Sequence, residues 1–263
     1  MSFYRLFPDR KPVIAMLHLL PLPGSPAYGG DLGVIYERAE WEAHTLVEAG
    51  VDALIVENFG DEPYQIGEPP SEQLALMAAV THQIVRSVEI PVGVNVQFNA
   101  WQTEMAIAHT CEADFVRVEV FVDTVVCAQG IVQPCSAQIM RCRKTLGAHQ
   151  VGIWADLQTK YTTNIVPQTI TQSAVDAYSA GADALIVTGG ATGQATPLDD
   201  VKQVREVVEL PVLVGSGTRI DNVSQVLETA DGAIVGSSLK EGGRAENPVS
   251  KEAAEAFMQV VGR

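Results

Sequence analysis

Positive charge is scarce in this sequence. Its 263 residues include 17 Lys and Arg against 32 Asp and Glu, which gives a formal net charge of −15. A chain this acidic is repelled by the phosphate backbone of nucleic acids and by an anionic membrane surface, which argues against both as partners. A phosphorylated small molecule is not excluded, because a single site can be locally positive.

Long apolar runs and paired cysteines are also missing. No stretch approaches the roughly 20 apolar residues that span a bilayer, and the opening MSFYRLFPDR has no apolar signal-peptide core. Cys111, Cys127, Cys135 and Cys142 form no CxxC pair, which favours reduced thiols. These absences predict a cytoplasmic protein with no integral membrane segment.

Several functional motifs are absent as well. There is no Walker loop, no GxGxxG that follows a strand and opens a helix, and no HxH or HExxH pair of metal ligands. No linker divides the chain, and a barrel domain needs about 250 residues. We therefore expect one domain over residues 1–263, with residues 1–11 as an N-terminal cap.

What is present is a regular alternation of apolar runs and helical stretches. The runs are continuously apolar, which is typical of parallel strands covered on both faces. Eight such runs, each followed by a helical stretch, predict an α/β protein, a single (β/α)8 (TIM) barrel. The predicted strands are residues 13–19, 52–58, 92–98, 114–120, 151–156, 183–188, 212–214 and 233–235.

Capping residues place the helices. Asp31 is expected to cap a helix that stops at Gly50, and Ser71 to cap the next. The apolar segment 121–134 reads as a long loop, and loops of that length are often functional. Further helices are expected to begin near Pro167, Asp199, Asp221 and Pro248.

The last two predicted strands end in small residues. Gly215, Ser216 and Gly217 follow the seventh strand, and Gly236 and Ser237 follow the eighth. In TIM barrels these two turns commonly hold a phosphate through backbone N–H groups and a helix N-terminus. The alternative is that both are tight turns that need glycine only for packing.

Polar residues cluster at the ends of the predicted strands, where barrels place their active sites. Unpaired charges in a core are costly, so the cluster either binds a ligand or satisfies itself, for example by pairing Arg117 with Glu57 or Glu119. The catalytic candidates are His18, Glu57, Arg117, Asp156 and Lys160, and the ligand-binding candidates are Asn58, Asn95, Asn99, Glu119, Thr188 and Gly189.

These side chains leave several roles open. His18 is either a general acid or base or a hydrogen-bonded residue at the barrel mouth. Lys160 either forms a Schiff base or binds an anion. Glu57 and Asp156 could hold Mg²⁺ or another divalent cation, although no histidine motif supports a metal. No cofactor is certain.

Two segments resemble the BtpA/SgcQ family: residues 15–26 (AMLHLLPLPGSP) and 50–61 (GVDALIVENFGD). The resemblance continues from about residue 11 to the C-terminus and includes residues 93–96, 115–118, 187–189, 192–193, 214–217 and 234–240. It implies a phosphate-binding TIM barrel. The family takes its name from a cyanobacterial role in biogenesis or stability of the photosystem I reaction centre, at the thylakoid surface.

The sequence departs from the family pattern at three places. Ala100 stands where the family has an acid, Tyr161 where it has His, and Glu119 where it has Asn. The glycine turns are intact. The resemblance therefore implies the same class of ligand with altered chemistry, or with none.

Together these observations predict a protein that binds a phosphorylated metabolite, with a sugar phosphate as the first expectation, and acts as a lyase or isomerase. The alternative is a non-catalytic photosystem I biogenesis factor that reaches a membrane through a protein partner. A homo-oligomer is compatible with the sequence, but nothing in it fixes the number of subunits.

Overall fold

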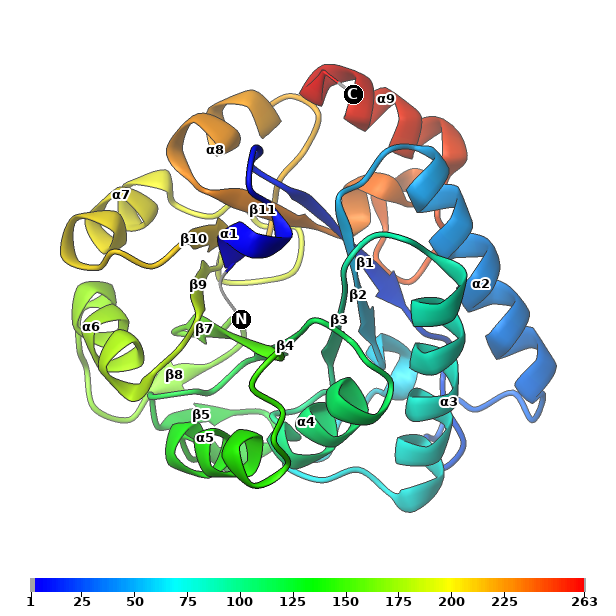
Figure 1. The fold of residues 1–263 in the computed structure, drawn as a ribbon, viewed down its shortest axis with the longest axis horizontal. Coiled ribbons are helices and arrows are strands. Elements are labelled where there is room, and N and C mark those ends of the chain that lie inside the picture. The colour runs from blue at the N-terminus through cyan, green and yellow to red at the C-terminus, as the bar shows by residue number, and fades with distance from the viewer. Residues whose placement is uncertain (1–2, 263) are drawn as a thin grey trace.

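The computed structural model describes residues 3–262 and confirms the predicted barrel. Eight parallel strands close on themselves, with helices between them around the outside (Figure 1). The predicted domain and N-terminal cap also include residues 1, 2 and 263, which lie outside the described residues. Within the described part of the chain, no helix is both long and apolar enough to cross a membrane.

Each of the eight predicted apolar runs coincides with one barrel strand to within a few residues. In the order of the barrel, each strand pairs with the next, and the last pairs with the first. The strands are β1 (Val13–His18), β2 (Ala53–Glu57), β3 (Val92–Asn95), β4 (Phe115–Val118), β7 (Gly152–Leu157), β9 (Ala184–Val187), β10 (Val212–Val214) and β11 (Gly232–Val235).

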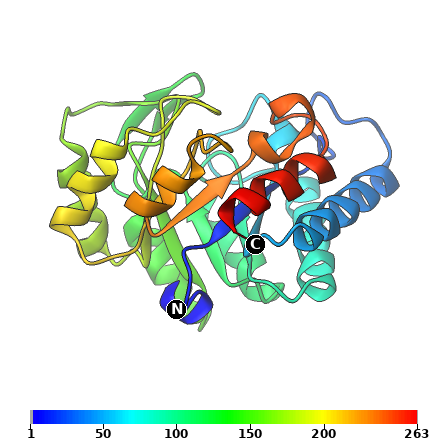
Figure 2. The ribbon, with the colours of Figure 1, turned by 90° about the horizontal axis from the view of Figure 1, so that it is seen from above.

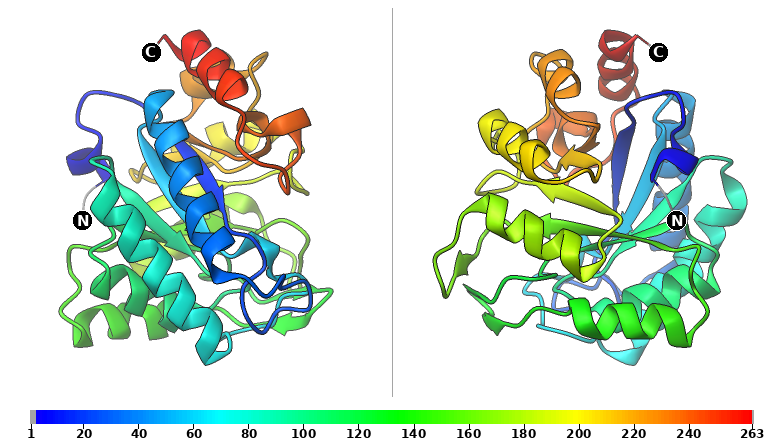
Figure 3. Two further views of the ribbon diagram at one scale, coloured as in Figure 1. Left: turned by 90° about the vertical axis from the view of Figure 1, so that its right-hand side faces the viewer. Right: turned by 60° about the vertical axis from the view of Figure 1, so that its left-hand side comes forward.

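Helices cover the outer surface of the barrel. Figure 3 (left) shows α9, α2 and α3 side by side on one flank. The helices are α2 (Leu32–Glu48), α3 (Ser71–Ser87), α4 (Trp101–Thr110), α5 (Ser136–Thr145), α6 (Ile170–Ala180), α7 (Leu198–Val207), α8 (Val223–Thr229) and α9 (Lys251–Val261), with short 3-10 turns η1 (Phe59–Asp61), η2 (Ser237–Leu239) and η3 (Glu241–Gly243).

Capping side chains decide where several helices begin. Asp31 caps α2 by accepting from the N–H groups of Gly33 and Val34, as predicted. Ser71 as a cap is wrong, because Pro70 holds that position and Ser71 is the first helical residue. Two of the later predicted starts are wrong by a few residues, because Thr169 and Ser250 supply the capping hydroxyls of α6 and α9. Two other helices begin at Leu198 and Val223.

Aromatic side chains close one end of the barrel. Phe115 and Trp154 stack inside it, with ring centroids 3.5 Å apart. Gly93 is required beside them, since a Cβ there would lie 2.1 Å from the Phe115 ring. The short helix α1 (Phe3–Leu6) adds Phe3, which packs on Trp154. Figure 2 shows α1 at the bottom of the barrel, opposite the long loops.

The prediction of a loop over residues 121–134 is wrong. The segment contains an antiparallel hairpin, β5 (Val125–Cys127) and β6 (Gly130–Val132), and β8 (Thr163–Asn164) pairs with β5. A two-residue turn at 128–129 closes the hairpin, and its inner side chains pack with Phe98. The alternation that marks such a strand is hard to see in only three residues. The four cysteines are free, as predicted.

Candidate active site

Strand register gathers the predicted polar residues at the carboxyl ends of the barrel strands. His18 lies opposite Glu57, and Glu57 opposite Asn95, across β1, β2 and β3. Because side chains alternate along a strand, these residues share the inward face with apolar residues deeper in the barrel. The apolar interior therefore ends in a polar mouth.

Two adjoining hollows occupy this mouth. The larger has a volume of about 590 Å³, and the smaller, about 30 Å³, lies against the turns after β10 and β11. Glu57, Arg117 and Lys160 line both. The other predicted residues that line one or both are His18, Glu119, Asp156, Gly215, Ser216, Gly217, Gly236 and Ser237.

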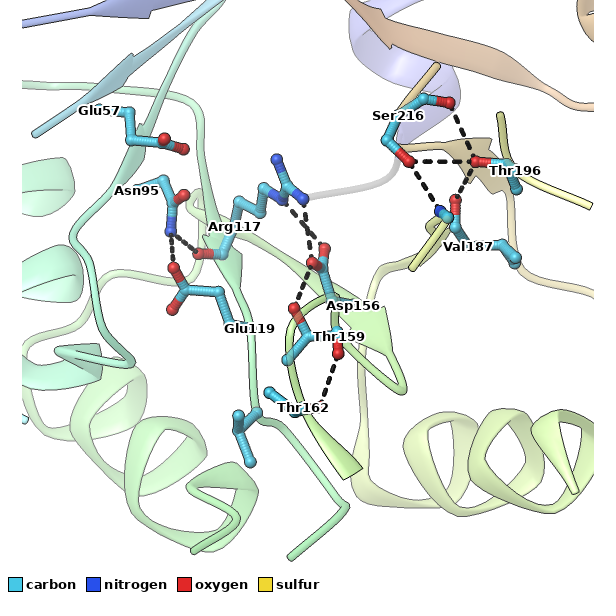
Figure 4. A network of polar contacts seen from close by, with 12 residues as sticks. Glu57, Asn95, Arg117, Glu119, Asp156, Thr159, Thr162, Val187, Thr196 and Ser216 are labelled. Carbon is cyan, nitrogen blue, oxygen red and sulfur yellow. Dashed lines mark hydrogen bonds and ion pairs between the residues drawn. The ribbon is translucent and has the colours of Figure 1, made fainter. Parts of the chain in front are cut away.

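Arg117 and Asp156 form a buried ion pair across β4 and β7 (Figure 4). Nε donates to Oδ1 at 3.0 Å and Nη2 to Oδ2 at 2.9 Å. Arg117 is therefore satisfied within the polar cluster, as the alternative to ligand binding required, but its partner is Asp156 and not Glu57 or Glu119, the two examples considered from the sequence. Burial disfavours the guanidinium, but the attraction of Asp156 outweighs it and raises the pKa of Arg117. Its Nη1 makes no hydrogen bond within the described residues.

Lys160 lies in the loop after β7, beside this pair. Within residues 3–262 its Nζ makes no hydrogen bond or ion pair, and it lines both hollows. Burial lowers the pKa of Lys160, and the charge of Arg117 adds to that effect. A lysine of lowered pKa has a larger neutral fraction, so it can act as a nucleophile or base.

The orientation of His18 fixes which ring nitrogen carries the proton. Nδ1 lies 2.9 Å from the carbonyl oxygen of Ala245, which can only accept, so Nδ1 is the donor. Burial, and next the charge of Lys240, hold the pKa of His18 well below its usual range. The neutral Nε2 faces Glu57 Oε1 at 3.9 Å and is free to accept a proton.

Glu119 belongs to a buried pair of carboxyl groups. The Asn95 amide donates to Oε1 of both Glu119 and Glu104, at 3.0 and 3.2 Å. The N–H of Asn99 donates to Glu119 Oε2 at 2.8 Å. Burial raises the pKa of Glu119 to about 8, and burial and then Glu119 raise that of Glu104 well above its usual range. Sequence reasoning missed Glu104, because it lies inside α4 and not at a strand end.

Five predicted ligand-binding residues line neither hollow: Asn58, Asn95, Asn99, Thr188 and Gly189. Asn58 accepts from the N–H of Gln97 at 2.7 Å and donates to Asp61 at 3.1 Å. Gly189 donates its N–H to the Ser216 hydroxyl at 2.7 Å, so that hydroxyl links two loops. The side chain of Asn58 and the N–H of Gly189 therefore connect the loops that surround the site.

The turns after β10 and β11 leave backbone donors without partners. Within residues 3–262, the N–H groups of Ser216, Gly217, Gly236 and Ser237 donate no hydrogen bond. Gly217 has φ +66°, and a Cβ there would lie 2.3 Å from the carbonyl oxygen of Gln194. We call these four residues, with Gly215, the glycine cradle.

The geometry does not favour a divalent cation between Glu57 and Asp156. Both oxygens of Asp156 already accept from Arg117. Among the described residues no group of three or more His, Cys, Asp or Glu side chains is arranged to hold a metal ion.

Some lining residues were not singled out in the sequence. Phe59 stacks on His18 with ring centroids 4.2 Å apart, and Thr159 donates to Asp156 at 3.1 Å. Tyr64, Gln97 and Phe98 line the larger hollow. Most of these residues directly follow strands β2, β3 and β7, and that position was the one signal that could have identified them.

Asp123 anchors the loop that carries Lys160. Its carboxylate accepts from the Gln158 N–H and from the side chains of Asn164, Gln168 and Ser173. Replacing Asp123 with Ala is expected to lower the free energy of unfolding by about 1–3 kcal/mol, because buried donors lose their acceptor. Urea denaturation measures the effect.

Asp221→Ala is the matched control for this variant, since Asp221 is exposed and pairs with an exposed arginine. Equal losses of stability in both variants would show that the Asp123 network is not what holds the loop.

The closed barrel with a polar cavity at the carboxyl ends of its strands defines a TIM-barrel protein. The model of the BtpA family matches residues 9–263, and the chain belongs to this family. An uncharacterized protein of Pyrococcus abyssi is 37% identical over 95% of this chain and 96% of its own. The photosystem I biogenesis protein BtpA of Synechocystis is 34% identical over 99% of this chain and 91% of its own.

Solved structures share the fold at low identity. Tryptophan synthase subunit alpha from Legionella pneumophila superimposes with a TM-score of 0.61 and 17% identity, covering 98% of this chain and 95% of its own. Thiamine phosphate pyrophosphorylase from Pyrococcus furiosus does so with a TM-score of 0.58 and 17% identity, covering 96% of both chains. At this identity the likeness shows the fold alone.

Proposed function

We propose that this protein binds a phosphorylated small metabolite, with its phosphate in the glycine cradle, and acts on it as a lyase or isomerase. The observation that carries the proposal is the set of unpartnered N–H groups at the ends of β10 and β11, facing one small hollow. Converging backbone N–H groups form anion sites without any lysine or arginine.

Local charge supports an anion at this place. Although the chain carries a net charge of −15, Arg117 and Lys160 both line the cradle hollow. The free Nη1 of Arg117 and the Nζ of Lys160 are the cationic donors that this hollow offers to an anion. One structural neighbour, thiamine phosphate pyrophosphorylase, is named for a phosphorylated compound, which agrees with this assignment.

Proton-transfer groups lie beside the cradle. His18 Nε2 can take a proton from a carbon near the phosphate, and Glu57, whose pKa burial raises, can supply one to an oxygen. Moving a proton between neighbouring carbons is isomerisation. If instead the carbanion's electron pair forms a double bond and a leaving group departs from the adjacent carbon with its own electron pair, the reaction is that of a lyase. Lys160 would hold the substrate oxygen or attack its carbonyl.

A substitution at Gly236 tests the cradle. A Cβ there would lie 3.4 Å from His18 Cε1, so Gly236→Val adds bulk to the hollow. Because the backbone of Gly236 has φ −115° and ψ −87°, outside the usual helical and extended regions, urea denaturation first checks that the variant is folded. We expect the parent to bind ribose 5-phosphate but not ribose, and Gly236→Val to bind it at least tenfold more weakly. Isothermal titration calorimetry measures both.

Gly217 is unsuitable for this test, because its Cβ would strike the backbone of Gln194 and Ala195. Gly29→Val is the control, since nothing lies within 4 Å of its Cβ position. If the parent binds neither ribose 5-phosphate nor inorganic phosphate, the cradle assignment is wrong.

A second candidate function is photosystem I biogenesis, and the name of the Synechocystis relative favours it. In this function the chain acts by binding a protein partner, and the glycine cradle is not needed. In a Synechocystis strain that lacks its own BtpA, Gly236→Val would then restore photosystem I as well as the parent chain does. Loss of rescue in this variant, with rescue by Gly29→Val, would favour the ligand-dependent function.

A further inference from the structure

The larger hollow extends well past the glycine cradle. Glu57, Arg117 and Lys160 line both hollows, whereas Tyr64 and Phe98 line only the larger. If the phosphate of a ligand lies in the cradle, the part of the ligand next to the phosphate therefore lies beside Glu57, Arg117 and Lys160. The far end of the ligand then reaches the part of the larger hollow that Tyr64 and Phe98 line, which we call the compartment.

The size of this compartment indicates a ligand larger than a simple sugar phosphate. The larger hollow, of which it is part, has a volume of about 590 Å³, apart from the cradle hollow of about 30 Å³. Sites of ~300–1,000 Å³ typically enclose a drug-sized ligand. A second group of substantial size therefore fits beyond the carbons that carry the phosphate.

Aromatic residues form one wall of the compartment. Phe98 is 8% exposed and is backed by Val120, Val125 and Val132. The Tyr64 hydroxyl donates to the carbonyl of Phe59 at 2.7 Å, which fixes the ring and satisfies its polar atom. Fixed aromatic rings suit stacking against a flat ring.

The polar groups of the compartment disfavour a second anion. Glu62, Glu119 and Glu246 line the larger hollow. Of its cations, Arg117 and Lys160 also line the cradle hollow, and Arg244 pairs with Glu246. Glu119 and Gln97 add a carboxyl and an amide to the same lining as Phe98. Uncharged donors and acceptors beside an aromatic wall match the edge of a nucleobase, which proteins read by hydrogen bonds and stacking.

We propose that this compartment binds a flat, uncharged heterocycle, so that the ligand is a nucleoside 5′-monophosphate or a close analogue. The phosphate would occupy the glycine cradle and the ring would lie against Phe98 and Tyr64. This inference rests on the proposed phosphate site and adds the second half of the ligand.

Calorimetric titration with AMP, IMP, UMP and CMP, compared with ribose 5-phosphate, tests the inference. At least one nucleotide is expected to bind tenfold or more tightly than ribose 5-phosphate. Ala128→Trp, on the exposed tip of the β5–β6 hairpin, adds a ring to the compartment without disturbing the barrel. This variant should bind the nucleotide no more tightly than ribose 5-phosphate, and its affinity for ribose 5-phosphate should equal that of the parent.

Two further variants sharpen the result. Phe98→Ala should also bind the nucleotide no more tightly than ribose 5-phosphate. Tyr178→Ala, which truncates an exposed aromatic side chain on α6, should keep the tighter binding of the nucleotide. If ribose 5-phosphate binds and every nucleotide binds no more tightly, the inference is overturned while the proposed function stands. If inorganic phosphate, ribose 5-phosphate and the nucleotides all fail to bind, both are overturned.

Discussion

Replacing Arg117 with Met should lower the free energy of unfolding by about 3–5 kcal/mol, the usual result of breaking a buried ion pair. The side chains of Arg117 and Asp156 are 4% and 0% exposed. The variant would leave the Asp156 carboxylate buried, with Thr159 as its remaining donor. Urea denaturation at pH 7 measures the loss.

A double variant separates the structural role of this pair from its role in the site. Arg117→Met combined with Asp156→Leu should recover most of the lost stability, because no unpaired charge stays buried. It should still fail to bind ribose 5-phosphate, since the guanidinium beside the cradle is gone. Arg219→Met, which opens an exposed pair, should leave stability close to that of the parent.

Either of two results would contradict this account. A single Arg117→Met variant as stable as the parent would mean that Asp156 finds another partner. A double variant that binds ribose 5-phosphate with unchanged affinity would remove Arg117 from the phosphate site.

The second large effect is a fall in stability as the pH rises from about 4.5 to 8. Burial raises the pKa of Glu119 from 4.5 to about 8, so across this window the folded protein keeps a proton that the unfolded chain releases. The free energy of unfolding should therefore decrease by up to about 1.4 kcal/mol per pH unit from this group. Glu104 adds to the trend, because its pKa is raised in the same direction.

Glu119→Gln should flatten this dependence, because it removes one titrating group and the charge that helps to raise the pKa of Glu104. The slope of the unfolding free energy against pH is the measurement. The free energy of unfolding itself also changes, because a glutamine has one acceptor oxygen where Glu119 has two, and Asn95 and Asn99 each donate to a different one. Glu89→Gln, an exposed change, should keep the parent slope, and an unchanged slope in Glu119→Gln would show that Glu119 is ionised throughout.

The sequence alone determined the barrel and the end of it that carries the polar residues. Each strand is a local apolar run, and glycine, proline and capping residues near its ends act over a few positions, so the alternation can be read without knowing the fold. His18, Glu57 and Asp156 lie at strand ends, and a barrel brings all strand ends to one mouth.

Only the tertiary structure decided which of these residues touch. Arg117 pairs with Asp156, 39 positions away, because the register of β4 against β7 places them together. The buried partner Glu104 and the aromatic compartment under the β5–β6 hairpin also arise from packing between distant segments. Such contacts depend on the register and tilt of neighbouring strands, and no local run of residues encodes either.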